Sequence, residues 1–427
     1  MGRFNLLLAF AAAVLVVGLA QSTSAQSGRG RGTVTIPASS IEKPADVGVR
    51  AHTNYRIFVP AEGAAANQGK GKGGATPQQV GPPFPGYFIE TPASLACAYN
   101  LVAQTPGCNP NVVTTNPSGG SRAIAIVDAF DYPEAASDLA FFCSQFGVAP
   151  ANFSVVYANG VEPPVDASGG WEIEEALDIE WSHAMAPNAK LFLVEAASNF
   201  NSDLFKAIGV AASLVAKNGG GEISLSWGEG EFSNEAAYDS HFSKAPNGVI
   251  FFASSGDGAG VIYPSASPYV VAAGGTSTSR NATTGWFQGS TAWQSTGGGI
   301  SAFEPRPSYQ DSVSSTVGPW RGTPDISFDA DPETPVWVYN SFYGEGLWFS
   351  VGGTSVASPS LAGIVNAAGG FAATTNAELT TIYGNLGNTG SLTDIASGSC
   401  GVYESNLTVT GYDNCTGVGV PNGYTGK

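Results

Sequence analysis

Apolar runs and amphipathic stretches alternate along the chain from residue 123 onward. Short runs made mostly of apolar residues predict buried strands, and the longer stretches between them have the spacing of amphipathic helices. The expected strands are 123–127, 154–158, 190–195, 222–227 and 248–253, and the expected helices are 134–146, 172–185 and 203–217. Apolar strands that alternate with helices are typical of a parallel sheet covered on both faces. The pattern therefore predicts an α/β fold with a predominantly parallel central sheet and helices on both faces.

The start of the chain has the pattern of a secretory signal peptide. Arg3 gives a positive start, an apolar run follows over 6–20, and the small residues 23–25 form a cleavage site. The apolar run is too short to indicate a membrane span, and no later stretch is long enough for one. We therefore expect residues 1–25 to be a signal peptide, and the exported chain to have no membrane partner once the signal is removed.

The next segment, residues 26–85, is an expected leader with weak periodicity. Within it, residues 69–74 read Gly-Lys-Gly-Lys-Gly-Gly, which is the composition of a flexible basic linker. This linker is the clearest boundary in the chain. Residues 86–427 then form one large domain, of a size that a single α/β domain can reach.

Charge narrows the choice of partners. The chain has 17 Lys and Arg against 34 Asp and Glu among its 427 residues, a formal net charge of -17. Such a chain is repelled by phosphate backbones, so nucleic acid is not an expected partner. Only 12% of the residues are charged, which limits self-repulsion when acid protonates the carboxylates and suits an acidic medium.

Five cysteines in an exported chain indicate two disulfides and one free thiol. Cys97 and Cys108 flank a loop that contains Pro and Gly, and Cys400 and Cys415 bracket the last glycine-rich loop, so we expect these two pairs. Cys143 lies in a helix-like stretch and is interpreted as a buried free thiol.

The strongest chemical signal is Ser355, in Gly352-Gly-Thr-Ser355-Val-Ala-Ser-Pro359. Two glycines predict a tight turn, and the small and apolar residues after the serine predict a buried helix. This places a hydroxyl at a helix start, where free N–H groups can bind a developing oxyanion. A serine nucleophile needs a base, and none of the three histidines lies in a Gly/Thr-rich motif. A carboxylate must then activate Ser355.

Two carboxylates are candidates for that base. Glu174 and Asp178 are four residues apart and share one face of the expected helix 172–185. The first can act as the base and the second can orient it. The other acids of this helix, Glu172, Glu175 and Glu180, are expected on its solvated face.

A third acid, Asp257, follows the apolar strand 248–253 in Ser-Ser-Gly-Asp257-Gly. Loops at the carboxyl ends of strands build the sites of open α/β sheets. A neutral Asp257 can donate a hydrogen bond to an oxyanion, but Asp-Gly is also ordinary turn chemistry.

Together these motifs resemble the sedolisin family of serine-carboxyl peptidases, whose fold is similar to that of the subtilisins. The resemblance runs from about residue 120 onward and includes Ser224-Leu-Ser-Trp-Gly228 and Arg321-Gly-Thr-Pro-Asp325. It implies a subtilisin-like fold, a peptidase domain at 86–427 and acid-active hydrolysis of polypeptides. The roles that it implies are nucleophile for Ser355, general base for Glu174, its partner for Asp178 and oxyanion-hole acid for Asp257.

The resemblance also bears on positions beside these. Asp128, after the first strand, occupies the region of an additional acid in some sedolisins, but it is equally a strand-end turn residue. Ser226, Trp227 and Gly228 are expected to pair with substrate as an added strand, rather than Trp227 being only a core residue.

One calcium ion is the expected cofactor. Calcium prefers carboxylate and carbonyl oxygens on turning chain, and the C-terminal segment resembles the sedolisin calcium loop. The implied ligands are Asp394, Ile395, Val409, Gly411 and Asp413. Val409 replaces a common glycine, but only its carbonyl would bind.

The leader departs from the family, because many sedolisins have a much larger folded prosegment, and it leaves open how activity is restrained. Two other functions compete with a secreted, monomeric acid endopeptidase. One is a catalytically silent binding protein of subtilisin fold. The other is a neutral enzyme that uses His183, which lies about 140° around the helix from Asp178 and so does not share a site with it.

Overall fold

The structure is a computed structural model that describes residues 32–61, 81–83, 87–342, 344, 346–401 and 406–427. The expected signal peptide 1–25 and the linker 69–74 lie outside the described residues. No helix of the described segments is long and apolar enough to cross a membrane.

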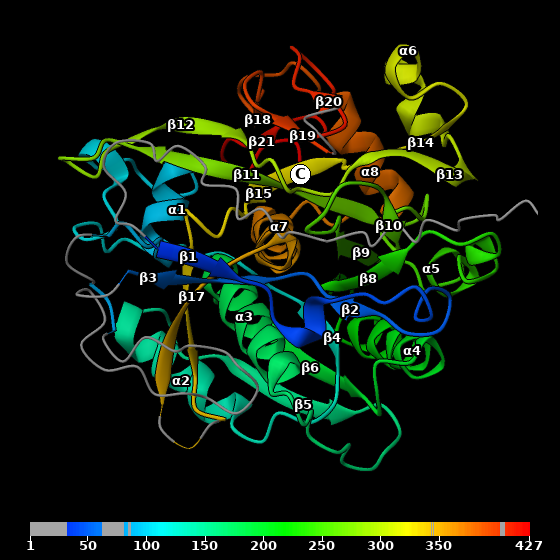
Figure 1. Ribbon diagram of the computed structural model, residues 1–427, viewed down its shortest axis with the longest axis horizontal. Helices are drawn as coiled ribbons and strands as arrows, with labels where there is room; N and C mark the ends of the chain where they lie inside the picture. The colour runs from blue at the N-terminus through cyan, green and yellow to red at the C-terminus, as the bar shows by residue number, and fades with distance from the viewer. Residues whose placement is uncertain (1–31, 62–80, 84–86, 343, 345, 402–405) are drawn as a thin grey trace, which may run out of the picture.

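The centre of the molecule is an eight-stranded sheet (Figure 1). Its order is β12-β11-β9-β7-β4-β6-β5, with β15 beside β11, and all neighbours are parallel except β11 and β12. The strands are β4 (Ala123–Ala129), β5 (Asn152–Tyr157), β6 (Lys190–Ala196), β7 (Gly221–Leu225), β9 (Val249–Ser254), β11 (Val271–Arg280), β12 (Phe287–Ala292) and β15 (Ile326–Asp329). The predicted α/β fold with a mostly parallel sheet is confirmed.

Helices cover both faces of this sheet. Along β4, Ile124 and Ile126 join the core under α2 (Ala135–Phe146), α3 (Gly170–Met185) and α7 (Thr354–Ala368). Ala125 and Val127 alternate with them and face α4 (Asn201–Lys217) on the other side. Because central strands such as β4 and β9 are buried along their whole length, their residues are mostly apolar without alternation. This is why the sequence pattern placed these elements within a few residues.

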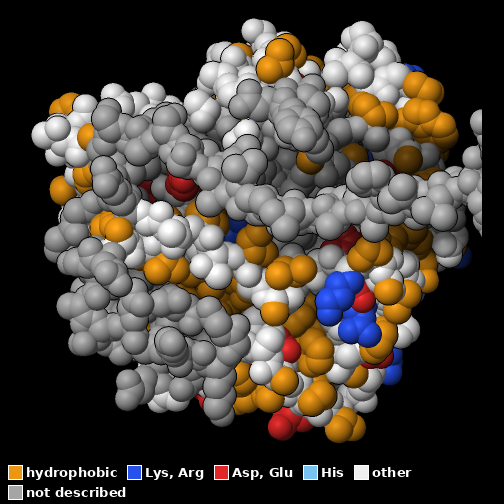
Figure 2. All heavy atoms as spheres, viewed as in Figure 1, with side chains coloured by type: hydrophobic (Ala, Val, Ile, Leu, Met, Phe, Trp, Pro, Cys, Tyr) orange, Lys and Arg blue, Asp and Glu red, His pale blue; other side chains and the backbone are white. Residues whose placement is uncertain are grey.

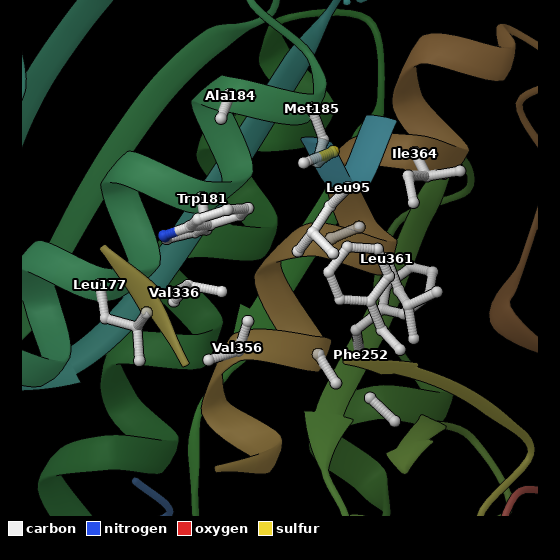
Figure 3. Close-up of a cluster of buried hydrophobic side chains, with 14 of the residues drawn as sticks. Leu95, Leu177, Trp181, Ala184, Met185, Phe252, Val336, Val356, Leu361 and Ile364 are labelled. Carbon is white, nitrogen blue, oxygen red and sulfur yellow. The ribbon is translucent and has the colours of Figure 1, made fainter. Parts of the chain in front are cut away.

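Helices α3 and α7 pack directly against each other, and Figure 3 shows the side chains between them. Leu177 and Trp181 of α3 lie on one side of this cluster, and Val356 and Leu361 of α7 on the other. The approach is close at Gly363, where an added Cβ would lie 2.7 Å from the Ser182 carbonyl oxygen. This packing fixes the start of α7 against the acids of α3.

Smaller sheets surround the core. One has the order β1 (Gly32–Thr35), β3 (Arg56–Pro60), β17 (Leu347–Gly352), β16 (Val336–Asn340), and another β10 (Ile262–Tyr263), β8 (Trp227–Gly230), β2 (His52–Thr53). The rest are the pairs β13 (Gly299–Pro305) with β14 (Trp320–Thr323), β18 (Leu392–Thr393) with β21 (Val420–Pro421), and β19 (Ser399–Cys400) with β20 (Asn406–Leu407). The remaining helices are α1 (Pro92–Ala98), α5 (Ser240–Ser243), α6 (Ser314–Val317), α8 (Thr375–Gly384), η1 (Ala38–Ser40), η2 (Pro106–Cys108), η3 (Glu235–Ala237) and η4 (Ser308–Val313).

Two details differ from the sequence prediction. The expected strand 222–227 is two strands, because β7 ends at Leu225 and β8 leaves the central sheet to pair with β2 and β10. The leader also contains more structure than its weak periodicity indicated, since β1, β2 and β3 all pair with strands of the body or with one another.

The cysteines lie as predicted. Disulfides join Cys97 to Cys108 and Cys400 to Cys415, and Cys143 is free and buried. Burial raises the pKa of the Cys143 thiol to about 12, so it is an inert core residue.

Many of the acidic residues are inside the molecule. Eighteen of the described Asp and Glu residues are buried. On the face shown in Figure 2, acidic side chains accordingly appear at only a few places among the described atoms. The surface is therefore less acidic than the sequence alone suggests.

Candidate active site

Ser355 lies at the start of α7, directly after a tight turn. Gly353 bends the chain after β17 with φ of 117°, a conformation that favours glycine, and α7 begins at the next residue. The N–H of Ser355 is in the first turn and has no partner inside the helix. It donates to the main-chain oxygen of Asn54 at 3.0 Å, and the Ser355 hydroxyl donates to the main-chain oxygen of Ser226 at 3.1 Å.

Ser226 connects α7 to α3. Pro359 has no N–H to donate to the Ser355 carbonyl one turn earlier. The Ser226 hydroxyl lies 3.4 Å from that carbonyl oxygen and 2.8 Å from Asp178 Oδ1. The proline that the sequence places after Ser355 thus frees a carbonyl for this contact.

Glu174 and Asp178 lie one turn apart on α3, and both are fully buried. Burial, followed by the charges of Asp178 and Asp128, raises the pKa of Glu174 well above its usual range, while the Ser355 hydroxyl acts in the opposite direction. Burial and the charge of Asp128 likewise raise the pKa of Asp178, whereas the hydrogen bond from the Ser226 hydroxyl lowers it. Two such carboxyls cannot both be ionised at low cost, so the pair keeps a proton.

Asp128 is the third acid of this group. It lies in β4, is fully buried, and its pKa is raised to about 8 by burial. Neither of its carboxyl oxygens has a hydrogen-bond partner among the described residues. Its charge raises the pKa of both Glu174 and Asp178, so the structure brings it close to these two candidate acids, and it lies within β4 rather than in a turn.

The prediction that Glu172, Glu175 and Glu180 form a solvated face was wrong. All three are fully buried, because α3 is enclosed on every side. Glu180 accepts from the N–H of Tyr339 at 3.1 Å, and Glu172 accepts from the N–H of Asp166 at 2.6 Å. Burial raises the pKa of Glu172 to about 8 and raises those of the other two well above their usual range.

Asp257 lies in the loop after β9 and contacts Thr354, the residue before Ser355. Its Oδ1 accepts from the N–H of Thr354 at 2.7 Å and from the Thr354 hydroxyl at 3.0 Å. Its Oδ2 is buried and has no partner among the described groups. Burial raises the pKa of Asp257 to about 6, although the nearby charge of Arg56 lowers it.

The segment Ser226-Trp227-Gly228 pairs with an extended chain. Strand β2 of the leader runs antiparallel to β8, with His52 opposite Gly228 and Thr53 opposite Trp227. The Trp227 side chain is buried and donates to the main-chain oxygen of Val127 at 2.7 Å. Trp227 is therefore a core residue, and its backbone pairs with β2 of the leader.

Sequence reasoning missed three residues of the site: Asn54, Arg56 and Ser254. Ser254 ends β9, just before the Asp257 loop, so the rule for strand ends could have found it. Asn54 and Arg56 lie in the leader, where no motif pointed to them. The Arg56 guanidinium donates to the main-chain oxygen of Asp257 and lies 5.3 Å from the Trp293 ring.

His183 contacts none of these groups. Its Nε2 lies 2.7 Å from the main-chain oxygen of Ala149, in the connection between α2 and β5. Burial lowers its pKa and so favours the neutral imidazole.

The proposed calcium ligands meet at one loop near the C-terminus. Asp394 Oδ2 accepts from the N–H of Gly411 at 2.9 Å, and Asp413 Oδ2 accepts from the N–H of Val409 at 3.2 Å. Asp394 Oδ1 is buried and lacks a partner among the described groups. No three His, Cys, Asp or Glu side chains cluster as a metal site in the described segments, so a calcium ion here would depend on two carboxylates and main-chain oxygens, including that of Ile395.

Comparison with known proteins agrees with this geometry. The Subtilase family model matches residues 167–380, half of the chain. Kumamolisin from Bacillus sp. (strain MN-32) is 31% identical over 71% of this chain and 59% of that protein, and sedolisin from Pseudomonas sp. (strain 101) is 29% identical over 58% and 47%. A solved structure of Pseudomonas sedolisin, a serine-carboxyl proteinase complexed with pseudo-iodotyrostatin, has a TM-score of 0.64 and 25% identity over 78% of this chain and 95% of that one.

The chain belongs to the subtilase family and, within it, to the sedolisin type. It spans 59% and 47% of the lengths of the two relatives named above.

Proposed function

We propose that this protein is an acid-active serine-carboxyl endopeptidase that cleaves polypeptides through an acyl-enzyme on Ser355. One observation carries the proposal: Ser355 begins a buried helix that packs against Glu174 and Asp178, with Asp257 beside the same helix start and no histidine in contact. The kinship with kumamolisin and sedolisin supports it.

Each residue has a step in the reaction. The Ser355 hydroxyl attacks the substrate carbonyl carbon and passes its proton to Glu174, which Asp178 holds in place. The oxyanion that forms accepts from the Ser355 N–H and from a protonated Asp257. Glu174 then gives its proton to the leaving amine, and a water attacks the acyl-enzyme with Glu174 again as base.

A carboxyl base suits this site because of its surroundings. A Glu174 whose pKa is raised is a stronger base than an ordinary glutamate. Asp257 must keep its proton to donate, so the rate falls as the pH rises through its pKa of about 6. The need for a protonated Asp257 favours catalysis in acid.

We also propose how the chain is used. Residues 1–25 direct export, residues 26–85 are a leader, and residues 86–427 are the peptidase domain of a secreted monomer. One calcium ion at Asp394, Ile395, Val409, Gly411 and Asp413 stabilises the C-terminal loop, where the carboxylates would otherwise repel each other.

The direct test is hydrolysis of an unfolded protein by the purified enzyme and by Ser355→Ala. We expect release of peptides in acid by the wild type and none by the variant. Equal turnover by both would reject Ser355 as the nucleophile.

A further inference from the structure

Thr354 connects the loop of Asp257 to the helix that carries Ser355. It is the first residue of α7, directly before Ser355, and it is fully buried. Its main chain and its hydroxyl both form hydrogen bonds with the Asp257 loop. Any change in how Asp257 is held therefore passes through this one residue.

The two oxygens of the Asp257 carboxyl differ in their surroundings. Oδ1 accepts from the N–H of Thr354 at 2.7 Å and from the Thr354 hydroxyl at 3.0 Å. Oδ2 is buried and has no partner in the part of the chain that the structure describes. An oxygen that accepts two hydrogen bonds has both lone pairs engaged and cannot also carry a proton between them. A proton on Asp257 therefore belongs on Oδ2.

The direction of the Thr354 hydroxyl supports this assignment. The hydroxyl oxygen accepts from the N–H of Gly256 at 3.0 Å, and a hydroxyl has a single proton to donate. That proton is directed at Oδ1 of Asp257. A proton on Oδ1 would face two donors of Thr354, and one of them would lose its acceptor in a buried place, which costs free energy.

Oδ2 faces the space in front of the Ser355 N–H. The acceptor of that N–H is the main-chain oxygen of Asn54, at 3.0 Å. A Cβ added to Gly353 would collide with both oxygens, at 2.6 Å from Asp257 Oδ2 and nearer still to the Asn54 oxygen. A proton on Oδ2 is thus placed beside the position where an acceptor of the Ser355 N–H lies, which is where the proposed oxyanion forms.

The side on which Asp257 carries its proton matters for the reaction. The two oxygens of an isolated carboxyl group are equivalent, so either can be protonated. In this site only a proton on Oδ2 can be donated to the oxyanion. An oxyanion site works best when its donors are already in place before the charge develops, because no rearrangement is then needed during the reaction.

We propose that Thr354 is a positioning residue for the reaction, whose hydroxyl and N–H keep Oδ1 of Asp257 as an acceptor and so hold the proton on Oδ2. This rests on the proposed function and adds to it the residue that decides which oxygen of Asp257 donates. Thr354 itself forms no bond with the substrate and passes on no proton.

The first experiment compares Thr354→Val, which removes the hydroxyl at nearly constant size, with Thr354→Ser, which keeps it. The substrate is an internally quenched decapeptide that the wild type cleaves in acid, selected from a mixed peptide library. We expect Thr354→Val to lower kcat about 10- to 100-fold with little change in KM, because Asp257 acts on the transition state. Thr354→Ser should keep most of the wild-type kcat. Equal losses in the two variants would overturn the role of the hydroxyl.

The pH profile supplies a readout that a loss of packing would not move. Burial raises the pKa of Asp257 to about 6, whereas the charge of Arg56 and the hydrogen bonds from Thr354 lower it. The charge of Asp257 in turn acts on Glu174, and the variants leave both Arg56 and Glu174 in place. Losing the hydroxyl removes a bond that favours the carboxylate, so the pKa of Asp257 should rise.

In Thr354→Val the alkaline fall of kcat/KM should therefore move to higher pH even though the variant is slower, and in Thr354→Ser it should stay in place. A slower Thr354→Val with an unmoved profile has only a structural defect and would overturn the proposal.

Thr375→Val is the matched control for the loss of a buried threonine hydroxyl. Thr375 is buried at the start of α8, and its hydroxyl accepts from the N–H of Phe251 at 3.1 Å. We expect Thr354→Val and Thr375→Val both to unfold at a lower temperature than the wild type. Thr375→Val should nevertheless keep the wild-type kcat and pH profile. A loss of kcat in Thr375→Val as large as that in Thr354→Val would overturn the special role of Thr354.

The outcomes separate this inference from the function on which it rests. Thr354→Ala also lacks the hydroxyl and gives the same comparison if Thr354→Val does not fold. Acid hydrolysis by the wild type, with kcat and pH profile unchanged in the variants that lack the hydroxyl, would overturn the inference and leave the peptidase assignment standing. No hydrolysis by the wild type would overturn both.

Discussion

Buried acids occur in two kinds of surroundings in this molecule. Asp325 is fully buried and forms a two-pronged ion pair with Arg321, at 2.7 and 2.6 Å, and Glu90 pairs in the same way with Arg280. Glu174, Asp178 and Asp128 are equally buried, but no ion pair joins them to a base within the described segments. The surroundings of Asp325 and Glu90 supply a cationic partner for an ionised carboxylate, whereas those of Glu174, Asp178 and Asp128 do not.

The two kinds of surroundings suit different roles, one in stability and the other in proton transfer. A paired carboxylate keeps its charge and holds two elements together, and losing either partner leaves a buried ion. Unpaired carboxyls keep protons because burial and mutual repulsion raise their pKa values. Only the second kind can take and return a proton during a reaction.

The largest expected effect comes from the unpaired group. Ser355→Ala and Glu174→Gln should each lower kcat/KM by about 10⁴-fold or more, and the double variant should be little worse, because residues that act as one unit are not additive. Glu174→Gln removes a buried carboxyl that other acids repel, so its unfolding free energy should not fall. Peptide hydrolysis and thermal unfolding on the same samples measure both.

The matched control for this prediction is His183→Ala, which should keep its turnover apart from any folding cost. Loss of turnover in folded His183→Ala, with Glu174→Gln still active, would mean that the base is not a carboxyl.

Removing an acid of the ion-paired group should instead lower the unfolding free energy and leave turnover unchanged. Asp325→Asn leaves the Arg321 charge buried and unpaired, so we expect a loss of about 3–5 kcal/mol of unfolding free energy and normal turnover by the folded fraction. Asp311→Asn breaks an ion pair whose acid is 64% exposed, and should cost less than about 1 kcal/mol. Similar costs for the two variants in urea unfolding would contradict the distinction.

Stability should depend on pH through the unpaired acids. Glu222 is fully buried and its pKa is raised to about 8, first by burial. The pKa of Glu222 is higher in the folded state than in the unfolded state. Its contribution to the unfolding free energy is therefore present below about pH 4.5 and is lost as the pH rises towards 8.

We therefore expect the unfolding free energy of Glu222→Gln to match that of the wild type at pH 4 and to exceed it by up to about 3 kcal/mol at pH 7. The exposed Glu162→Gln should follow the wild type throughout. A constant difference between Glu222→Gln and wild type from pH 4 to 7 would show that Glu222 keeps no proton.

The smallest predicted effect concerns calcium. A bound ion adds about 2.7 kcal/mol when free calcium is 100 times its dissociation constant, so chelation near pH 5 should lower the unfolding temperature of the wild type. Asp413→Asn should already be lower and should respond little to chelator. Affinity should weaken in stronger acid, because burial raises the pKa of Asp413. An unfolding temperature of the wild type that does not change with chelator would contradict the calcium site.

How much the sequence predicted depended on the kind of signal. The strands and helices of the central sheet were predictable because residues buried on both faces leave long apolar runs, as in β4 and β9. Ser355, Glu174, Asp178 and Asp257 could be singled out as candidates because their motifs carry chemistry, and the lack of a histidine motif left a carboxylate as the candidate base.

The rest depended on tertiary contacts. Glu172, Glu175 and Glu180 were misplaced because helix periodicity cannot show that α3 is enclosed on all sides. Asn54 and Arg56 carry no motif and enter the site only because β2 and β3 pair with β8 and β17. Short strands of this kind take their structure from their partners.

The central claim is that a carboxyl pair and a neutral Asp257 operate Ser355, and the pH dependence of kcat/KM on an unfolded protein tests it most directly. The account predicts hydrolysis in acid that falls as the pH rises through about 6, where burial places the pKa of Asp257. Maximal hydrolysis above pH 7 would contradict it.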